Sequence, residues 1–144
     1  ITNNNVKLIK QFLKDYESSE KFEDAVFDLI NYYKANQRPD DELAIYIKYL
    51  PLLNQSYIFL NSYAWRMSER GQNLEDALNK VDMALLIVGE KHQGYANILD
   101  TKAEVLWKMG RIQDAISIIE EALRIDPDSD YYKTQKEKFS QDIN

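Results

Sequence analysis

Hydrophobic side chains recur along this chain at the spacing of α-helices. From Phe22 to Tyr33, apolar residues fall at offsets of 0, 3, 4, 7, 8 and 11, which places them along one face of a helix. A similar stripe runs from Val6 to Tyr16. Pro39 is followed directly by three acidic residues. This indicates another helix start, because proline has no amide hydrogen to leave unpaired and carboxylates favour the positive end of the helix dipole.

The same periodicity predicts eight helices joined by short polar loops, and no strand. Their expected ranges are roughly 5–17, 22–36, 40–50, 56–70, 74–88, 94–109, 112–125 and 129–141. The chain contains only 4 glycines and 3 prolines, and this scarcity of chain breakers also favours helices over a turn-rich β-fold. No linker divides the sequence, so we expect a single helical domain over residues 1–144.

Two segments of the C-terminal half share one pattern, which appears in GQNLEDALNKVDMAL and again in GRIQDAISIIEEAL. Each has a glycine near its start, an acidic residue directly before an alanine, and a second alanine seven residues later. The preceding helices, LNSYAWRMSERG and LDTKAEVLWKMG, also align, with Leu60 over Leu99 and Ala64 over Ala103. Alanines at matching sites of paired helices indicate close helix–helix approach. A recurring two-helix unit of this kind indicates a solenoid.

These residues resemble the tetratricopeptide repeat, a helix–turn–helix unit of about 34 residues. The last repeat meets the family pattern at Leu99, Ala103, Leu106, Ala115, Ile119 and Pro127, while Lys102 departs from it. The preceding repeat meets it at Leu60, Tyr63, Ala64, Met67, Ala77 and Val81, with one extra residue after Gly71 and a longer final loop. The resemblance implies an all-α fold, a right-handed α–α superhelix of about eight helices.

The resemblance also divides the domain into segments. We expect degenerate N-terminal helices over 1–55, one repeat over 57–95, another over 96–129 and a capping helix over 130–144. Ala44 lies about one repeat length before Ala77, which favours pairing the helices near 22–36 and 40–50. The alternative pairs those near 5–17 and 22–34 around Ala25. The cap is expected to turn Tyr131, Tyr132, Gln135 and Phe139 toward the core and Lys133, Lys136, Glu137 and Lys138 toward solvent.

Charge and composition exclude several classes of function. The net charge is −6, whereas a nucleic-acid binder normally carries a basic surface. No apolar stretch is long enough to span a bilayer. The chain has no cysteine, and its single histidine, His92, lies in a polar loop. We therefore expect no catalytic residues and no cofactor. These features do not distinguish between cellular compartments. A start at Ile1 is compatible with a piece of a longer protein.

Four carboxylates share the spacing of a calcium-binding loop. Asp126, Asp128, Asp130 and Glu137 fall at offsets of 0, 2, 4 and 11, as in that loop. Tyr131, however, stands where the loop needs glycine for a sharp turn. The same acidic residues also suit the start of a helix. We therefore expect no metal site.

The resemblance implies a protein or peptide partner held in a groove lined by the first helix of each repeat. The matching positions are Asn61, Trp65, Ser68, Asn97, Asp100, Thr101 and Glu104. The subclass that holds a C-terminal carboxylate has lysines and arginines in this groove, and none occurs at these positions. Asp100 and Glu104 predict a negative groove, so we expect a neutral or basic partner. Because Glu104 is expected in the open groove, we also expect Glu104→Lys to leave the fold intact.

Two alternatives stay open at this point. Trp65 suits either a groove anchor or a packing residue between helices, whereas Trp107 is expected to pack. The C-terminal half is also similar to repeat regions appended to bacterial proteins, including thioredoxin-like ones. The second hypothesis is therefore a structural or self-associating extension of a larger protein, with its oligomeric state open.

Overall fold

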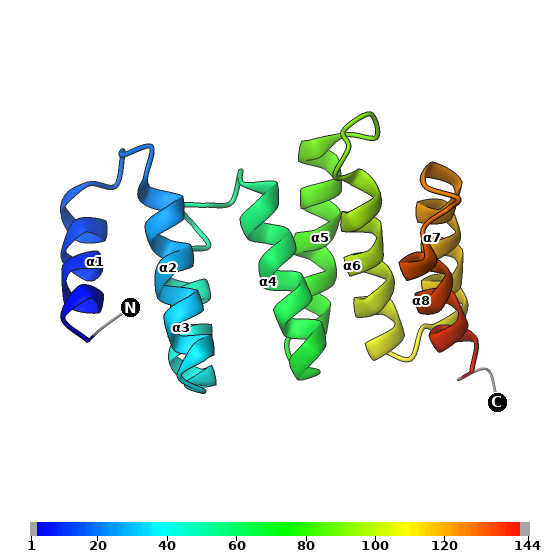
Figure 1. The fold of residues 1–144 in the computed structure, drawn as a ribbon, viewed down its shortest axis with the longest axis horizontal. Helices are drawn as coiled ribbons and strands as arrows, with labels where there is room; N and C mark the ends of the chain where they lie inside the picture. The colour runs from blue at the N-terminus through cyan, green and yellow to red at the C-terminus, as the bar shows by residue number, and fades with distance from the viewer. Residues whose placement is uncertain (1–2, 142–144) are drawn as a thin grey trace. The chain divides into compact units, whose positions relative to one another are not determined.

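The computed structural model describes residues 3–141, and every element in this range is a helix (Figure 1). The helices are α1 (Asn3–Asp15), α2 (Phe22–Ala35), α3 (Pro39–Tyr49), α4 (Tyr57–Arg70), α5 (Leu74–Val88), α6 (Tyr95–Lys108), α7 (Ile112–Ile125) and α8 (Asp130–Ser140). The all-α prediction and its eight helices are confirmed for these residues. The end of the predicted cap, 142–144, lies outside them.

The contacts divide the chain into two compact units, residues 1–54 and 55–144. In the first unit, α2 packs against both α1 and α3. The α2–α3 contact is not built around alanine as expected, because Ala44 is exposed. Large side chains fill the unit instead, among them Phe22 and Tyr49, whose rings meet edge to face with centroids 5.7 Å apart. That the two units form one domain stays a prediction.

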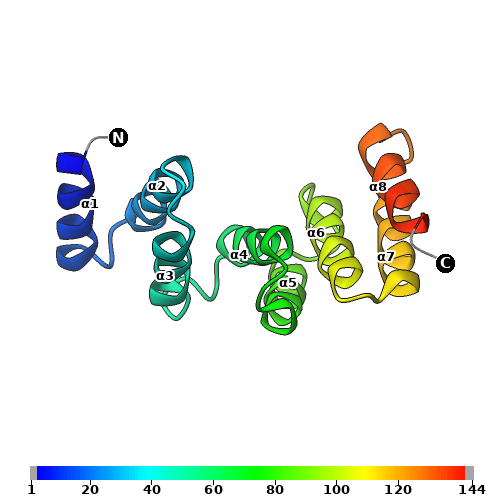
Figure 2. The same cartoon turned by 90° about the horizontal axis from the view of Figure 1, so that it is seen from below.

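In the second unit, each helix packs against the next, and α4 also packs against α6 (Figure 2). The alanines predicted at the helix contacts, Ala64, Ala77, Ala103 and Ala115, are all completely buried. Gly71 follows α4 with a φ of 62°, a left-handed conformation that costs glycine nothing. The small side chains and the turn glycine together explain how the paired helices approach closely.

Overpacking one of these alanine contacts tests the arrangement. Ala115→Leu is expected to lower the free energy of unfolding by about 1–3 kcal/mol, because Ala115 is completely buried and three more carbons would overpack the contact. The measurement is unfolding in urea. Gln113→Leu, at an exposed position of the same helix, is the control and should change stability by less than about 0.5 kcal/mol. Equal midpoints for both variants would contradict the predicted packing.

The acidic segment near the C-terminus is a loop only as far as Ser129 and is helical from Asp130 onward. Ser129 caps α8, since its Oγ accepts from the Tyr132 amide at 3.3 Å, and the helix begins at Asp130. Glu137 therefore lies within the helix instead of closing a calcium-binding loop. Within residues 3–141, every helix is too short or too polar to cross a membrane.

Candidate functional site: a hollow between α4, α6 and α8

Three helices of the second unit, α4, α6 and α8, border an open hollow of about 320 Å³. Its lining consists of Asn61, Ser62, Trp65, Asn97, Asp100, Thr101 and Tyr131. Five of these are predicted groove residues. Ser62 and Tyr131 were not predicted, and the predicted Ser68 and Glu104 are not part of the lining. We call this space the hollow.

The spacing of polar residues on each helix explains why they face the same space. Residues separated by three, four and seven positions share one face of a helix. The three polar stripes are Asn61, Trp65 and Ser68 on α4, Asn97, Thr101 and Glu104 on α6, and Tyr131, Gln135 and Lys138 on α8. The stripe on α8 was missed as part of the site, although its spacing in the sequence is the same.

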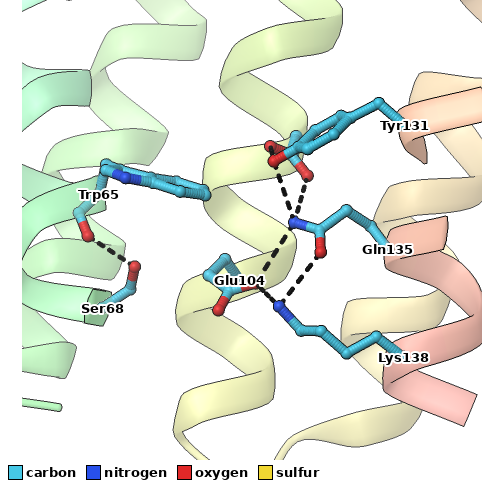
Figure 3. Close-up of polar contacts among 7 residues, drawn as sticks. Trp65, Ser68, Glu104, Tyr131, Gln135 and Lys138 are labelled. Atoms are coloured by element: carbon cyan, nitrogen blue, oxygen red, sulfur yellow. Dashed lines mark hydrogen bonds and ion pairs between the residues drawn. The ribbon is translucent and has the colours of Figure 1, made fainter. Parts of the chain in front are cut away.

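Trp65 forms one wall of the hollow. Its side chain is half-buried, and its ring extends from α4 toward α6 (Figure 3). Ser68, one turn further along α4, is completely buried, and its hydroxyl donates to the Trp65 carbonyl at 2.7 Å. The ring of Trp65 is therefore available to the hollow, whereas the hydroxyl of Ser68 is used within its own helix.

Asp100 is held from the side of α8. Its carboxylate is only 2% exposed and accepts hydrogen bonds from the Tyr131 hydroxyl and from the Gln135 amide, each at 3.1 Å. Burial raises the pKa of the Asp100 carboxyl, and the hydrogen bonds from Gln135 and Tyr131 partly oppose that rise. Burial and the charge of Asp100 likewise raise the pKa of Tyr131, so this hydroxyl remains protonated and able to donate.

Glu104 is also engaged by α8, contrary to expectation. The Lys138 ammonium donates to Glu104 Oε2 at 2.5 Å and to Gln135 Oε1 at 3.1 Å (Figure 3). Lys138 was expected in solvent and Glu104 in an open groove, but the Glu104 side chain is 8% exposed and the Lys138 side chain 36%. We therefore expect Glu104→Lys to disturb this part of the fold rather than leave it intact, because it would place two ammonium groups at one contact.

The remaining cap residues show a similar mixture of outcomes. Phe139 and Gln135 are buried as predicted, but the ring of Tyr131 is 51% exposed, because only its hydroxyl reaches inward to Asp100. Trp107 packs on Phe139 with ring centroids 5.6 Å apart, which agrees with its expected packing role. The hydrogen bonds from Tyr131 and Gln135 of α8 hold Asp100 of α6 in place beside the hollow.

The single imidazole lies apart from the hollow. His92 is exposed in the loop between α5 and α6, where its Nδ1 accepts from the Gly94 amide at 3.0 Å. Its ring meets the edge of Tyr57 at a centroid distance of 5.3 Å. Neither contact brings a nucleophile or a carboxylate to the imidazole, so the geometry here is that of a loop-stabilising residue.

Comparison with known proteins identifies the fold. No protein-family model matches the sequence, and no curated protein matches it. The Arabidopsis OM64 TPR domain superimposes with a TM-score of 0.66 and 14% identity, covering 83% of this chain and 95% of that one. PilW, described as a widely conserved type IV pilus biogenesis factor, superimposes with a TM-score of 0.65 and 16% identity, covering 99% and 81%. These likenesses show a helical-repeat fold of the tetratricopeptide type, as predicted.

Proposed function

We propose that the second unit is a non-catalytic protein-binding module that holds a segment of a partner in the hollow. The observation that carries this proposal is the hollow itself, because five residues assigned to a binding groove from the repeat pattern line one space between first helices. The fold is a second support, because the chain shares it with a TPR domain and with a pilus biogenesis factor.

The lining suits a polypeptide segment. Asn61 and Asn97 carry amides that offer both a donor and an acceptor, as the backbone of an extended peptide requires. The half-buried ring of Trp65 offers apolar contact area, the property of residues that dominate binding energy at interfaces. Among the residues that the structure describes, Asp100 is the one acidic lining residue, and no lysine or arginine lines the hollow. The partner segment is therefore neutral or basic, and salt weakens its association.

A catalytic role is not part of this proposal. General acid–base catalysis needs a titratable group within reach of a reacting atom. The imidazole lies in the α5–α6 loop, and the Asp100 carboxylate already accepts two hydrogen bonds from α8. The hollow offers recognition by hydrogen bonds, one aromatic wall and one charge, which is the chemistry of binding.

Replacing the aromatic wall tests the proposal. Peptides selected from a random library on the immobilised full chain are expected to bind Trp65→Ala more weakly by over about 1 kcal/mol, roughly fivefold, because the ring supplies apolar contact area in the hollow. Leu86→Ala is the matched control, since Leu86 is 85% exposed on α5 and does not line the hollow. Calorimetric titration gives both affinities. Selected peptides that bind both variants equally would refute the proposal.

The second candidate is a self-associating or structural extension of a larger bacterial protein, of the thioredoxin-like kind. One observation favours it, which is the group of exposed apolar side chains on α5, Met83, Leu86 and Ile87. Sedimentation of the chain separates the candidates. A dimer that dissociates on Leu86→Lys favours self-association through α5, and a monomer favours the binding module.

A further inference from the structure

Two side chains at equivalent positions on α4 and α6 differ in their hydrogen bonding. The repeat alignment places Asn61 of α4 over Asp100 of α6, and Asp100 accepts hydrogen bonds from two side chains of α8. The Asn61 oxygen Oδ1 is buried without a hydrogen-bond partner among the described residues. Asn61 also lines the hollow. Because a buried acceptor without a donor is unfavourable, turning the amide so that this oxygen meets a donor inside the hollow would stabilise this position.

The charge of the hollow favours a cationic donor. Asp100 is the only charged residue among the described residues that line the hollow, and its two bonded donors, Tyr131 and Gln135, are neutral groups. A carboxylate has about four acceptor positions, so two remain. The nearest cation of the network, Lys138, already pairs with Glu104. Burial raises the pKa of Asp100, and a cation brought close to it would offset that cost of burying its charge.

The aromatic wall adds a third complementary feature. A tryptophan ring face attracts ammonium and guanidinium groups, and the Trp65 ring extends across the hollow from α4 toward α6 (Figure 3). The chain makes such contacts at its other tryptophan, where the ammonium groups of Lys108 and Lys138 lie 4.4 Å and 4.3 Å from the Trp107 ring centroid. No cation within residues 3–141 is part of the hollow's lining.

We propose that the hollow is a subsite for one basic side chain, lysine or arginine, of the partner segment. Its charged head donates to Asp100 and Asn61, and its aliphatic stem lies along Trp65. A space of about 320 Å³ is at the small end of ligand pockets, which suits one side chain rather than a helix. This inference rests on the proposed binding function and adds the chemistry that the hollow selects.

The experiment uses the full chain and the peptides selected from a random library. These peptides are expected to share a lysine or arginine at one position. Replacing that arginine with citrulline, or that lysine with norleucine, is expected to weaken binding by about tenfold or more, because a charge-assisted hydrogen bond is lost. Asn61→Leu and Asp100→Asn are each expected to reduce this preference. Asn79→Leu, at an exposed position of α5, makes the same exchange as Asn61→Leu outside the hollow and should preserve it.

The outcomes separate this inference from the proposed function. Peptides that depend on Trp65 but bind equally well with citrulline or norleucine would leave the binding function standing and overturn the basic subsite. Peptides that do not depend on Trp65 would overturn both. Melting temperature provides a further readout, since Asn61→Leu removes an unpaired buried oxygen and should not lower it. A lower melting temperature with unchanged peptide preference would assign Asn61 a purely structural role.

Discussion

Glu104→Lys is expected to lower the free energy of unfolding by about 2–4 kcal/mol. The carboxylate of Glu104 is nearly buried and accepts from the Lys138 ammonium at 2.5 Å. Breaking a buried pair by removing one partner typically costs about 3–5 kcal/mol. The value expected here is smaller because the Lys138 side chain remains 36% exposed, and solvent screens its charge. Chemical denaturation monitored by circular dichroism measures the loss.

A charge swap provides the control for this prediction. The double variant Glu104→Lys, Lys138→Glu restores opposite charges at the contact and should recover part of the lost stability, whereas Glu104→Gln should lie between wild type and Glu104→Lys. If the single reversal left the unfolding midpoint unchanged, Glu104 would have to be an open groove residue and the contact with α8 would be refuted.

The helices and the second unit's packing could be predicted from sequence because their signals are local. Apolar spacing defines one helix at a time, and the recurring alanines mark where two neighbouring helices approach. Ala64 and Ala103 occupy matching positions and are both completely buried. The same rule failed at Ala44, which is exposed. The rest of the repeat pattern does not accompany Ala44, and larger side chains supply the buried surface of α3, namely Glu42, Ile45, Tyr46 and Tyr49.

The residues of the candidate site could be predicted on α4 and α6 but not on α8. Asn61, Trp65 and Asp100 were placed from the repeat register, and they line the hollow. The pair Glu104–Lys138 spans 34 residues, and neither residue's own helix shows which face of α8 meets α6. The sequence therefore left Glu104 in an open groove and Lys138 in solvent. A pairing of this kind depends on how helices stack, which local periodicity does not encode.

Phe139 anchors α8 through its buried ring, and Phe139→Ala is expected to have the largest effect on stability. Its ring is completely buried and packs against Trp107 with centroids 5.6 Å apart. Truncating a buried phenylalanine to alanine costs about 3–5 kcal/mol, from lost burial and from the cavity left behind. We expect the free energy of unfolding to fall by that amount, and the emission of Trp107 to shift toward longer wavelength.

The consequence for the hollow makes this prediction a test of the whole site. Loosening α8 would withdraw Tyr131 and Gln135 from Asp100, so hydrogen exchange should rise in α8 and in the middle of α6 before it rises in α4. Phe139→Leu, which keeps most of the apolar volume, is the control and should cost less than about 1.5 kcal/mol. Exchange that rises uniformly over α4 to α8 in Phe139→Ala would instead mean that the cap and the repeats unfold as one cooperative unit.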